Sequence, residues 1–366
     1  MGTIHMASEA KIHFVKFDSS DFYSTLKERV KNHFKKNGIT PYANSFMIFK
    51  IFFFLTGFIG TYLFLLLGNL SILGSYSLWI ILGLFTAFVG VNICHDAVHG
   101  AISRNQKVNT VLGYLFNVAG TNAYIWKLRH NQIHHTYTNI QDFDGDINIT
   151  PLIRMSPHQK LRKIHRYQHW YSWFLYSLTS LSWVFIGDYK KFFGRKIVNH
   201  KLKKPPAYEY FSFLFFKAFY YSAFLVAPII FIDLAWWHIL LGFVAMHLIE
   251  GFCLAIMIQM AHLLEGLDFP LPNIKGEIEN SWAIHQLNTT ADFARKNRLV
   301  AFFFGGLNFH IEHHLFQRIC HVHHPQISQI IKRTAKEFRI PYKEFITLKD
   351  AFNSHQKFLR IMGRNI

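Results

Sequence analysis

Eight histidines, grouped in three short clusters, are the residues of this sequence whose type and spacing could do chemistry. The clusters read His95-Asp-Ala-Val-His99, His130-Asn-Gln-Ile-His134-His135 and His310-Ile-Glu-His313-His314. Residues three or four apart share one face of a helix, so histidines at this spacing within each cluster should aim at one point. These sets are His95 with His99, His130 with His134, and His310 with His313 and His314.

A doubled histidine, such as His134-His135, turns about 100° around a helix between its two members and can therefore serve two metals. Eight neutral imidazoles are too many for one zinc ion and suit a pair of transition metals. Zinc, copper, iron and nickel all accept imidazole, so the ligands alone leave the metal open. Two metals beside apolar segments suggest O₂ chemistry on an apolar substrate.

The rest of the sequence predicts a membrane protein. Of its 366 residues, 51% are hydrophobic, and they are gathered in runs. Four runs of about 22 residues or more are long enough to cross roughly 30 Å of hydrocarbon. They are residues 46–67, 72–94, 211–232 and 236–260. We therefore expect one all-α domain over residues 1–366, with four transmembrane helices and a cytoplasmic helical cap that holds a histidine-rich dimetal site.

Charge predicts the orientation. Lysine and arginine flank the predicted spans, so the positive-inside rule places both termini and the long middle segment in the cytoplasm. An even number of crossings separates the three clusters, which therefore fall on that same side. The formal charge of +18 fits this bias and an attraction to anionic lipid headgroups. No nucleic-acid motif is present, and three scattered cysteines are expected to be apolar fillers rather than ligands.

Most other histidines are expected at the surface or at the membrane interface, because they have no partner at ligand spacing. This group is His5, His13, His33, His158, His200, His238 and His355. We expect the same of His321, His323 and His324, on the surface of the cap. His247 and Glu250 form a polar pair near the middle of the fourth span and are left outside the site.

The three clusters and their surroundings resemble the integral-membrane fatty acid desaturases. The segment HNQIHHTYTNIQDFDGD (130–146) is similar to the second histidine box of acyl-lipid and acyl-CoA desaturases. HRYQHWY (165–171) is similar to a stretch of bacterial linoleoyl-CoA-desaturase-like members. GGLNFHIEHHLF (305–316) is similar to the third box of front-end desaturases. The resemblance covers roughly residues 10 to 360. It departs from front-end enzymes at His310, where they have Gln, and at Gln317, where they have Pro, so it does not fix the position of the new double bond.

The resemblance implies that nine histidines hold two irons, the ninth being His262 at the end of the fourth span, helped by Gln259. The metal pair and O₂ would then remove two hydrogens from an acyl chain carried by coenzyme A, acyl carrier protein or a lipid. We allow for zinc in place of iron in overexpressed protein. A hydroxylase or ketolase on the same scaffold is the nearest alternative. A metal transporter is a more distant one, because its histidines should line the spans.

Several polar residues are expected around the ligands. Asp142, Asp144 and Asp146 imitate the start of a calcium loop, but Ile147 and Ile153 stand where it needs Gly and Glu. An orienting role towards ligand imidazoles is better motivated for these aspartates, as for Asp96 and Glu312. The resemblance implies that His285 also lies near the site and supports the ligands rather than binding metal itself. Headgroup contacts are expected from basic residues such as Lys127, Arg129 or Arg166.

An electron donor must be a separate protein, because the sequence has no HPGG motif of a fused cytochrome b5 domain. The three cysteines also cannot hold a four-cysteine cluster. We expect a ferredoxin or cytochrome b5 type of carrier, acidic and steered by the basic residues Lys160, Arg162, Lys163 and Arg166.

Overall fold

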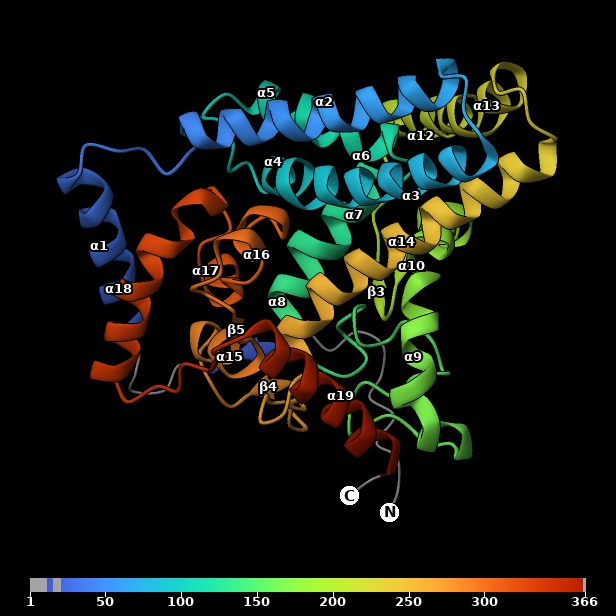
Figure 1. The fold of residues 1–366 in the computed structure, drawn as a ribbon. Helices are drawn as coiled ribbons and strands as arrows, with labels where there is room; N and C mark the ends of the chain where they lie inside the picture. Colours follow the sequence, from blue (N-terminus) through green and yellow to red (C-terminus); the bar gives the residue numbers. More distant parts are fainter. Residues whose placement is uncertain (1–11, 16–20, 365–366) are drawn as a thin grey trace.

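The computed structural model describes residues 12–15 and 21–364, and in these residues the fold is mainly helical (Figure 1). Strands are confined to three two-residue pairs. β1 (His13–Phe14) pairs with β4 (Glu277–Ile278) and β5 (Asp292–Phe293) with β6 (Glu344–Phe345), both in parallel. β2 (Lys196–Ile197) and β3 (His200–Lys201) are antiparallel. The prediction of an all-α architecture is confirmed.

Among the residues that the structure describes, four helices are long and apolar enough to cross a membrane. They are α2 (Ser45–Leu67), Ile72–Val98, Ala207–Phe231 and α14 (Trp236–His262). The second comprises α3 (Ile72–Val89), the π-helical turn η2 (Gly90–Cys94) and α4 (His95–Val98). The third comprises α12 (Ala207–Tyr221), η6 (Ser222–Val226) and α13 (Ala227–Phe231). The four predicted apolar helices are thus present, but the second and fourth extend far enough to carry His95 and His262.

Local sequence explains where these helices begin. The Asn44 side chain accepts a hydrogen bond from the Met47 N–H, and the Ser71 hydroxyl accepts one from the Gly74 N–H. Each therefore satisfies a backbone donor that the first turn leaves free. The short segment 68–71 joins α2 to α3 and turns the chain back, so that the first two spans form a hairpin.

The second and fourth spans pack closely because small residues lie where they cross. A Cβ atom added at Gly83 of α3 would lie 2.3 Å from the carbonyl oxygen of Met246 in α14, so the two backbones touch there. Glycine at helix crossings permits this approach in membrane proteins. The contact fixes α3 and α14 side by side, and both run on towards the histidine clusters.

The segment between the hairpins is a series of short helices. In order, they are α5 (Gln106–Gly113), α6 (Leu115–Val118), α7 (Ala123–Lys127), η3 (Leu128–His134), α8 (His135–Tyr137), η4 (Lys163–Tyr167), α9 (Gln168–Ser177), α10 (Thr179–Ser182), η5 (Trp183–Gly187) and α11 (Asp188–Gly194). Helices α9 and α10 pack on α14, and exposed aromatic side chains such as Trp170 and Phe174 cover α9 on its outside.

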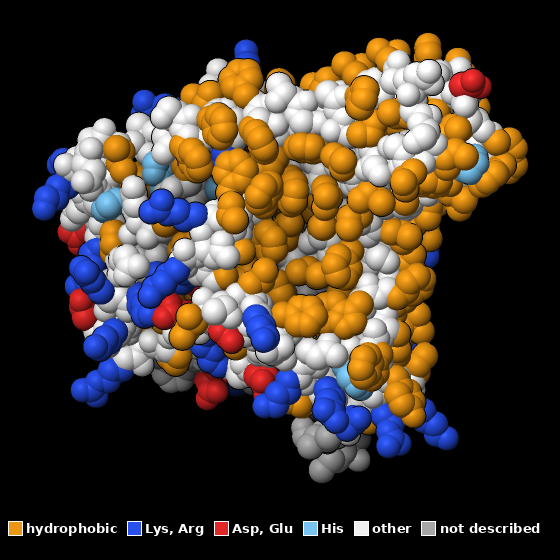
Figure 2. Space-filling model, in the orientation of Figure 1, with side chains coloured by type: hydrophobic (Ala, Val, Ile, Leu, Met, Phe, Trp, Pro, Cys, Tyr) orange, Lys and Arg blue, Asp and Glu red, His pale blue; other side chains and the backbone are white. Residues whose placement is uncertain are grey.

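The cap is built from both ends of the chain. It contains α1 (Asp21–Lys36), α15 (Trp282–Thr289), α16 (Arg298–Phe303), α17 (His310–Leu315), η7 (His321–His323), α18 (His324–Glu337) and α19 (Leu348–Arg364). Phe22, Leu26 and Val30 of α1 share a core with Ile327 and Ile331 of α18. In Figure 2 hydrophobic side chains spread over the span helices, whereas Lys and Arg gather on the cap and along the lower edge.

One histidine of the supposed surface group is in fact buried. The Tyr176 hydroxyl lies 3.1 Å from His355 Nε2, and His355 Nδ1 lies 2.8 Å from the Leu263 carbonyl oxygen. The surface prediction for His355 was wrong because α19 is amphipathic and places this residue on its buried face with Phe358 and Leu359. His5 lies outside the described residues.

Candidate metal centre

Nine histidines converge where the spans meet the cap. They come from α4 and the residue after it, from η3 and α8, from the end of α14 and from α17, and all nine are buried. They are His95, His99, His130, His134, His135, His262, His310, His313 and His314. The structure thus brings together all eight cluster histidines and the ninth that the resemblance implied.

Ring nitrogens sort most of these histidines into two groups, in each of which one ligand atom per residue lies within 4.8 Å of the others. The first group is His95, His99, His130 and His313, and the second is His134, His262 and His314. His135 borders both groups, with ring centroids 4.6 Å from His313 and 4.3 Å from His314. The His310 ring is 4.7 Å from that of His262. The adjacent residues His313 and His314 face different groups, as their rotation around the helix predicts.

The second cluster contains one contact beyond the expected pairing. His130 was expected to aim with His134, and a ring nitrogen of each lies within 4.8 Å of the other. The His135 ring is closer to His130, with the two Nε2 atoms 3.1 Å apart. The reason is that Leu128–His134 is π-helical, which brings residues five apart close together along the helix. His134 is thereby turned towards His262 and the second group.

Hydrogen-bond acceptors hold the outer nitrogens of several of these rings. Nδ1 of His262 lies 3.1 Å from the Thr289 carbonyl oxygen, and Nδ1 of His310 lies 2.9 Å from that of Leu307. Nδ1 of His134 lies 3.2 Å from both oxygens of Asp144. Because an acceptor needs the Nδ1 proton, Nε2 of each ring presents a lone pair to the interior, which is the arrangement found in metal-binding histidines.

The inward nitrogens fit a pair of transition metal ions. Nε2 of His134 lies 3.2 Å from Nε2 of His262, and two such lone pairs repel unless a proton or a metal ion lies between them. Two imidazoles on one ion at about 2.1 Å would hold their nitrogens roughly 3.0–3.4 Å apart. Further buried Nε2 atoms have no hydrogen-bond partner among the described residues, namely those of His99, His310, His313 and His314.

Burial also favours the protonation state that binds metal. It lowers the pKa of His99, His130 and His135 well below the ordinary value, and it does the same for the three histidines of α17. These imidazoles are therefore neutral, as metal ligands must be. His134 differs, since burial lowers its pKa but the Asp144 and Asp146 carboxylates outweigh burial and raise it.

The three aspartates after the second cluster have different roles. Asp144 is fully buried against His134. The Asp146 carboxylate lies 3.5 Å from His134 Nδ1 and forms a 2.6 Å ion pair with Arg129. Asp142 is exposed and accepts a hydrogen bond from the Gln141 side chain instead of contacting an imidazole. Arg129, from which a headgroup contact was expected, is mostly buried, stacks over the Trp183 ring at 4.8 Å and lines a cavity.

Asp96 connects the first cluster to the segment that follows the third. Its carboxylate lies 3.8 Å from His95 Nδ1 and 2.9 Å from His321 Nδ1, and Nε2 of His321 lies 2.7 Å from the Lys50 ammonium. His321, His323 and His324 were expected on the cap surface, and all three are buried. That prediction was wrong because η7 folds back against α2 and α4, where His321 contacts Lys50 and Asp96.

Glu312, His285 and Gln259 lie close to the centre, but no hydrogen bond joins their side chains to a ligand imidazole. Glu312 accepts a 2.9 Å hydrogen bond from the Tyr342 hydroxyl, and burial beside Asp292 raises its pKa. His285 is buried against Phe14. Its neighbour Gln286 is the residue that the sequence analysis missed, since its Oε1 lies 2.6 Å from His314 Nδ1.

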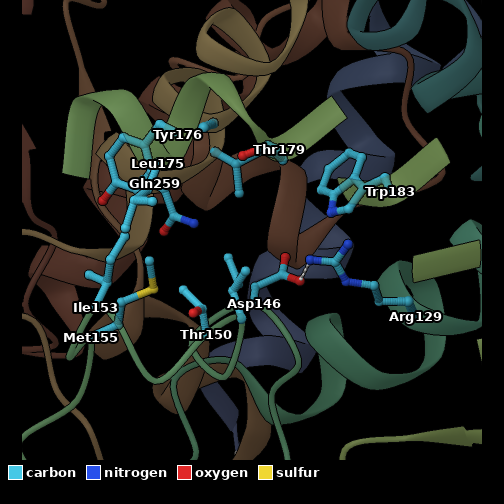
Figure 3. Close-up of a pocket in the computed structure, with 13 residues that line it drawn as sticks. Arg129, Asp146, Thr150, Ile153, Met155, Leu175, Tyr176, Thr179, Trp183 and Gln259 are labelled. Atoms are coloured by element: carbon cyan, nitrogen blue, oxygen red, sulfur yellow. Dashed lines mark ion pairs between the residues drawn. The ribbon is translucent and has the colours of Figure 1, made fainter. Parts of the chain in front are cut away.

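Two neighbouring cavities lie beside this centre. The inner cavity is lined by His95, His130 and His310 and otherwise mainly by apolar residues, among them members of η2, α6, α7 and α14. The outer one is shown in Figure 3, where the Arg129–Asp146 ion pair lies beside Trp183, and Gln259 points in from α14. Trp183 and Ile258 line both cavities. An apolar chain that fills the inner cavity would therefore lie beside three of these histidines.

Comparisons with known proteins agree with this geometry. A sequence model of the family described as fatty acid desaturase matches residues 73–346. The chain is 33% identical over 363 residues to the sn-1 linoleoyl-lipid 6-desaturase of Arthrospira platensis, which covers 98% of this chain and 96% of that protein. It is 34% identical over 348 residues to the protein of the same name from Synechocystis sp., covering 94% and 96%. An acyl-lipid (8-3)-desaturase of Physcomitrium patens is 33% identical over 359 residues, covering 97% of this chain and 74% of that protein.

This chain belongs to the fatty acid desaturase family. The resemblance stated from the histidine clusters is thereby confirmed. The desaturase is an oxidoreductase that acts on fatty acyl chains, and its four apolar helices make it an integral membrane protein. Its buried histidine groups can bind metal.

Proposed function

We propose that this desaturase uses O₂ to introduce a double bond into the acyl chain of a membrane lipid, at two irons held by the nine clustered histidines. The observation that carries the proposal is the convergence of nine buried histidines, four of them with an unpartnered Nε2 atom, beside a mainly apolar cavity that His95, His130 and His310 line. When bound, the iron pair supplies the reduction of O₂ and the removal of two hydrogens from adjacent carbons. The names of the relatives, linoleoyl-lipid and acyl-lipid desaturases, support a lipid as the carrier.

The protein's own contribution is to position the ligand imidazoles and to exclude water from the reacting carbons. Asp144, Thr289 and Leu307 hold the Nδ1 sides of three ligands, which keeps their lone pairs directed inwards. Val91, Leu254 and Leu307 line the cavity beside the histidines, which keeps water from the reacting carbons. A narrow cavity also limits which carbons of the chain can lie against the centre.

Electrons are proposed to come from a separate acidic carrier of the ferredoxin or cytochrome b5 type. Lys160, Arg162, Lys163 and Arg166 are exposed on one segment, which supports docking by charge. We place this surface, both termini and the metal centre in the cytoplasm, on the basis of the positive-inside rule. Residues 1–366 are proposed to act as one membrane domain.

The test is lipid profiling of a host that expresses the chain, with mass analysis of the products. A new product lighter than its substrate by two hydrogens is the expected result. A product heavier by one oxygen would favour the hydroxylase alternative, and the absence of both in membranes that contain the folded, iron-loaded protein would refute the proposal.

A further inference from the structure

A polar cluster lies inside the membrane-spanning region, and the reaction proposed above does not use it. The Ser180 hydroxyl donates to Glu250 Oε2 at 2.7 Å and lies 2.8 Å from His247 Nδ1, while the Tyr220 hydroxyl lies 2.8 Å from His247 Nε2. All four side chains are buried. Because the Ser180 hydrogen goes to Glu250, Ser180 accepts from His247 Nδ1–H, and Tyr220 donates to Nε2. Such groups cost free energy within a membrane and are candidates for function.

Glu250 of this cluster lines the inner cavity, which also reaches the metal centre. Glu250, Leu254 and Ile258 are four residues apart and form one stripe along α14, facing Thr86 and Gly90 of the second span. The stripe from Ile258 to Glu250 is about 12 Å long, from eight residues at 1.5 Å each. The cavity therefore runs from the histidines into the membrane-spanning region and meets a carboxyl group there.

The cavity ends at this point because the two helices close on each other. Gly83 lies three residues before Thr86, and Met246 lies four residues before Glu250. A Cβ at Gly83 would be only 2.3 Å from the Met246 carbonyl oxygen. With the backbones in contact there is no room for a chain between them. Thr86 and Glu250 thus form the floor of the cavity.

The outer cavity leads towards a polar part of the surface. The outer cavity contains the Arg129–Asp146 pair (Figure 3) and shares Ile149 and Ile153 with an open polar pocket on the basic segment that carries Lys160 and Arg162. A polar acyl carrier fits this side, whereas the closed, mainly apolar cavity suits the methyl end of the chain. The methyl end therefore points towards Glu250.

We propose that Glu250, held by Ser180 and His247, sets the longest acyl chain that the desaturase accepts beyond the reacting carbons. This inference rests on the proposed function. A chain that reaches the floor packs against it, and a longer one must push apolar carbons into a hydrogen-bonded carboxyl group. Buried polar groups that lose their partners are costly, so the longer chain is rejected.

The test compares chain-length preference in host membranes supplied with fatty acids that differ by two carbons. Glu250→Ala deepens the cavity and should raise the relative conversion of the next longer chain about 10-fold. Thr86→Leu raises the floor from the other helix and should shift the preference towards the next shorter chain. Glu250→Gln keeps the size of the side chain and the Ser180 hydrogen bond, and should restore the wild-type preference. Leu241→Ala changes an exposed side chain on the same helix and is the matched control.

A purely structural cluster would give a different pattern. Glu250→Ala would then lower the conversion of all chain lengths together, and Thr86→Leu would leave the preference unmoved, which would overturn the inference. If Glu250→Ala does not accumulate in the membrane, the direction of the Thr86→Leu shift decides alone. A wild-type protein that is folded and iron-loaded but makes no double bond would overturn the proposed function as well, whereas an active one with unmoved preferences overturns the inference alone.

Discussion

Replacing Asp144 by asparagine should weaken metal binding, because this carboxylate orients His134. Its Oδ1 accepts a 2.9 Å hydrogen bond from the Asp146 N–H, its Oδ2 accepts one of 2.9 Å from the Asn139 N–H, and both oxygens lie 3.2 Å from His134 Nδ1. An amide nitrogen in place of either oxygen would face a backbone N–H that is itself a donor. Leaving a buried donor unpaired costs about 1–3 kcal/mol of folding stability. Disturbing an acceptor behind a metal ligand costs about 10- to 100-fold in metal affinity or activity.

The assay measures bound iron, thermal unfolding in detergent and double-bond formation for Asp144→Asn beside Asp142→Asn. Asp142 is the matched control because it is exposed and has a φ of 66°, a conformation that asparagine adopts readily. The control should behave as the wild type. Wild-type iron content and activity in Asp144→Asn would refute the assignment of Asp144 as the residue that orients His134.

Replacing any one of the nine clustered histidines by alanine should abolish double-bond formation without preventing membrane insertion, because ligands act as a set. Elemental analysis of active wild-type protein should find about two irons per chain, and a single metal would contradict the two-metal assignment. Turnover should require an added electron carrier and should fall as salt rises, because screening weakens docking to the basic segment; rates that ignore ionic strength would contradict that docking. Burial lowers the pKa of His355 to about 4 from 6.5. The unfolded chain therefore takes up this proton first as the pH falls, so about 3 kcal/mol of stability present above pH 6.5 should be lost towards pH 4. Thermal unfolding in detergent over this range should show a shallower loss for His355→Gln than for the wild type.

The parts of this fold that the sequence predicts are those with a local cause. The apolar runs of membrane-spanning length correctly predicted four helices, and the histidine spacing identified eight of the nine converging rings. His262 has no partner at ligand spacing, and only the resemblance to a family pointed to it. The contact between His130 and His135 could not be predicted, because the sequence contains no signal for the π-helical turn at Leu128–His134.

The hydrogen-bond acceptors that orient the ligand imidazoles could not be predicted from the sequence, because tertiary packing brings them to the site. His262 depends on the carbonyl oxygen of Thr289, and His314 depends on the Gln286 side chain, which belongs to a helix that arrives from another part of the chain. A backbone carbonyl carries no residue-specific signal. The buried state of His321 has a similar origin, since it requires Asp96 and Lys50 from two different spans.

The aspartates after the second cluster show that sequence spacing alone does not predict which of several identical residues contacts a ligand. Asp142, Asp144 and Asp146 are equally spaced, and neither helical nor strand periodicity applies in the turn that contains them. Asn139 and Asp142 adopt positive φ angles there, so the chain doubles back and Asp144 meets the N–H of Asn139 as well as the ring of His134. The same backbone path leaves Asp142 exposed and brings Asp146 to Arg129. The path of one turn thus gives three identical residues three different environments. Of the three, only Asp144 lies within hydrogen-bond distance of His134 Nδ1 and can fix the tautomer of that ring.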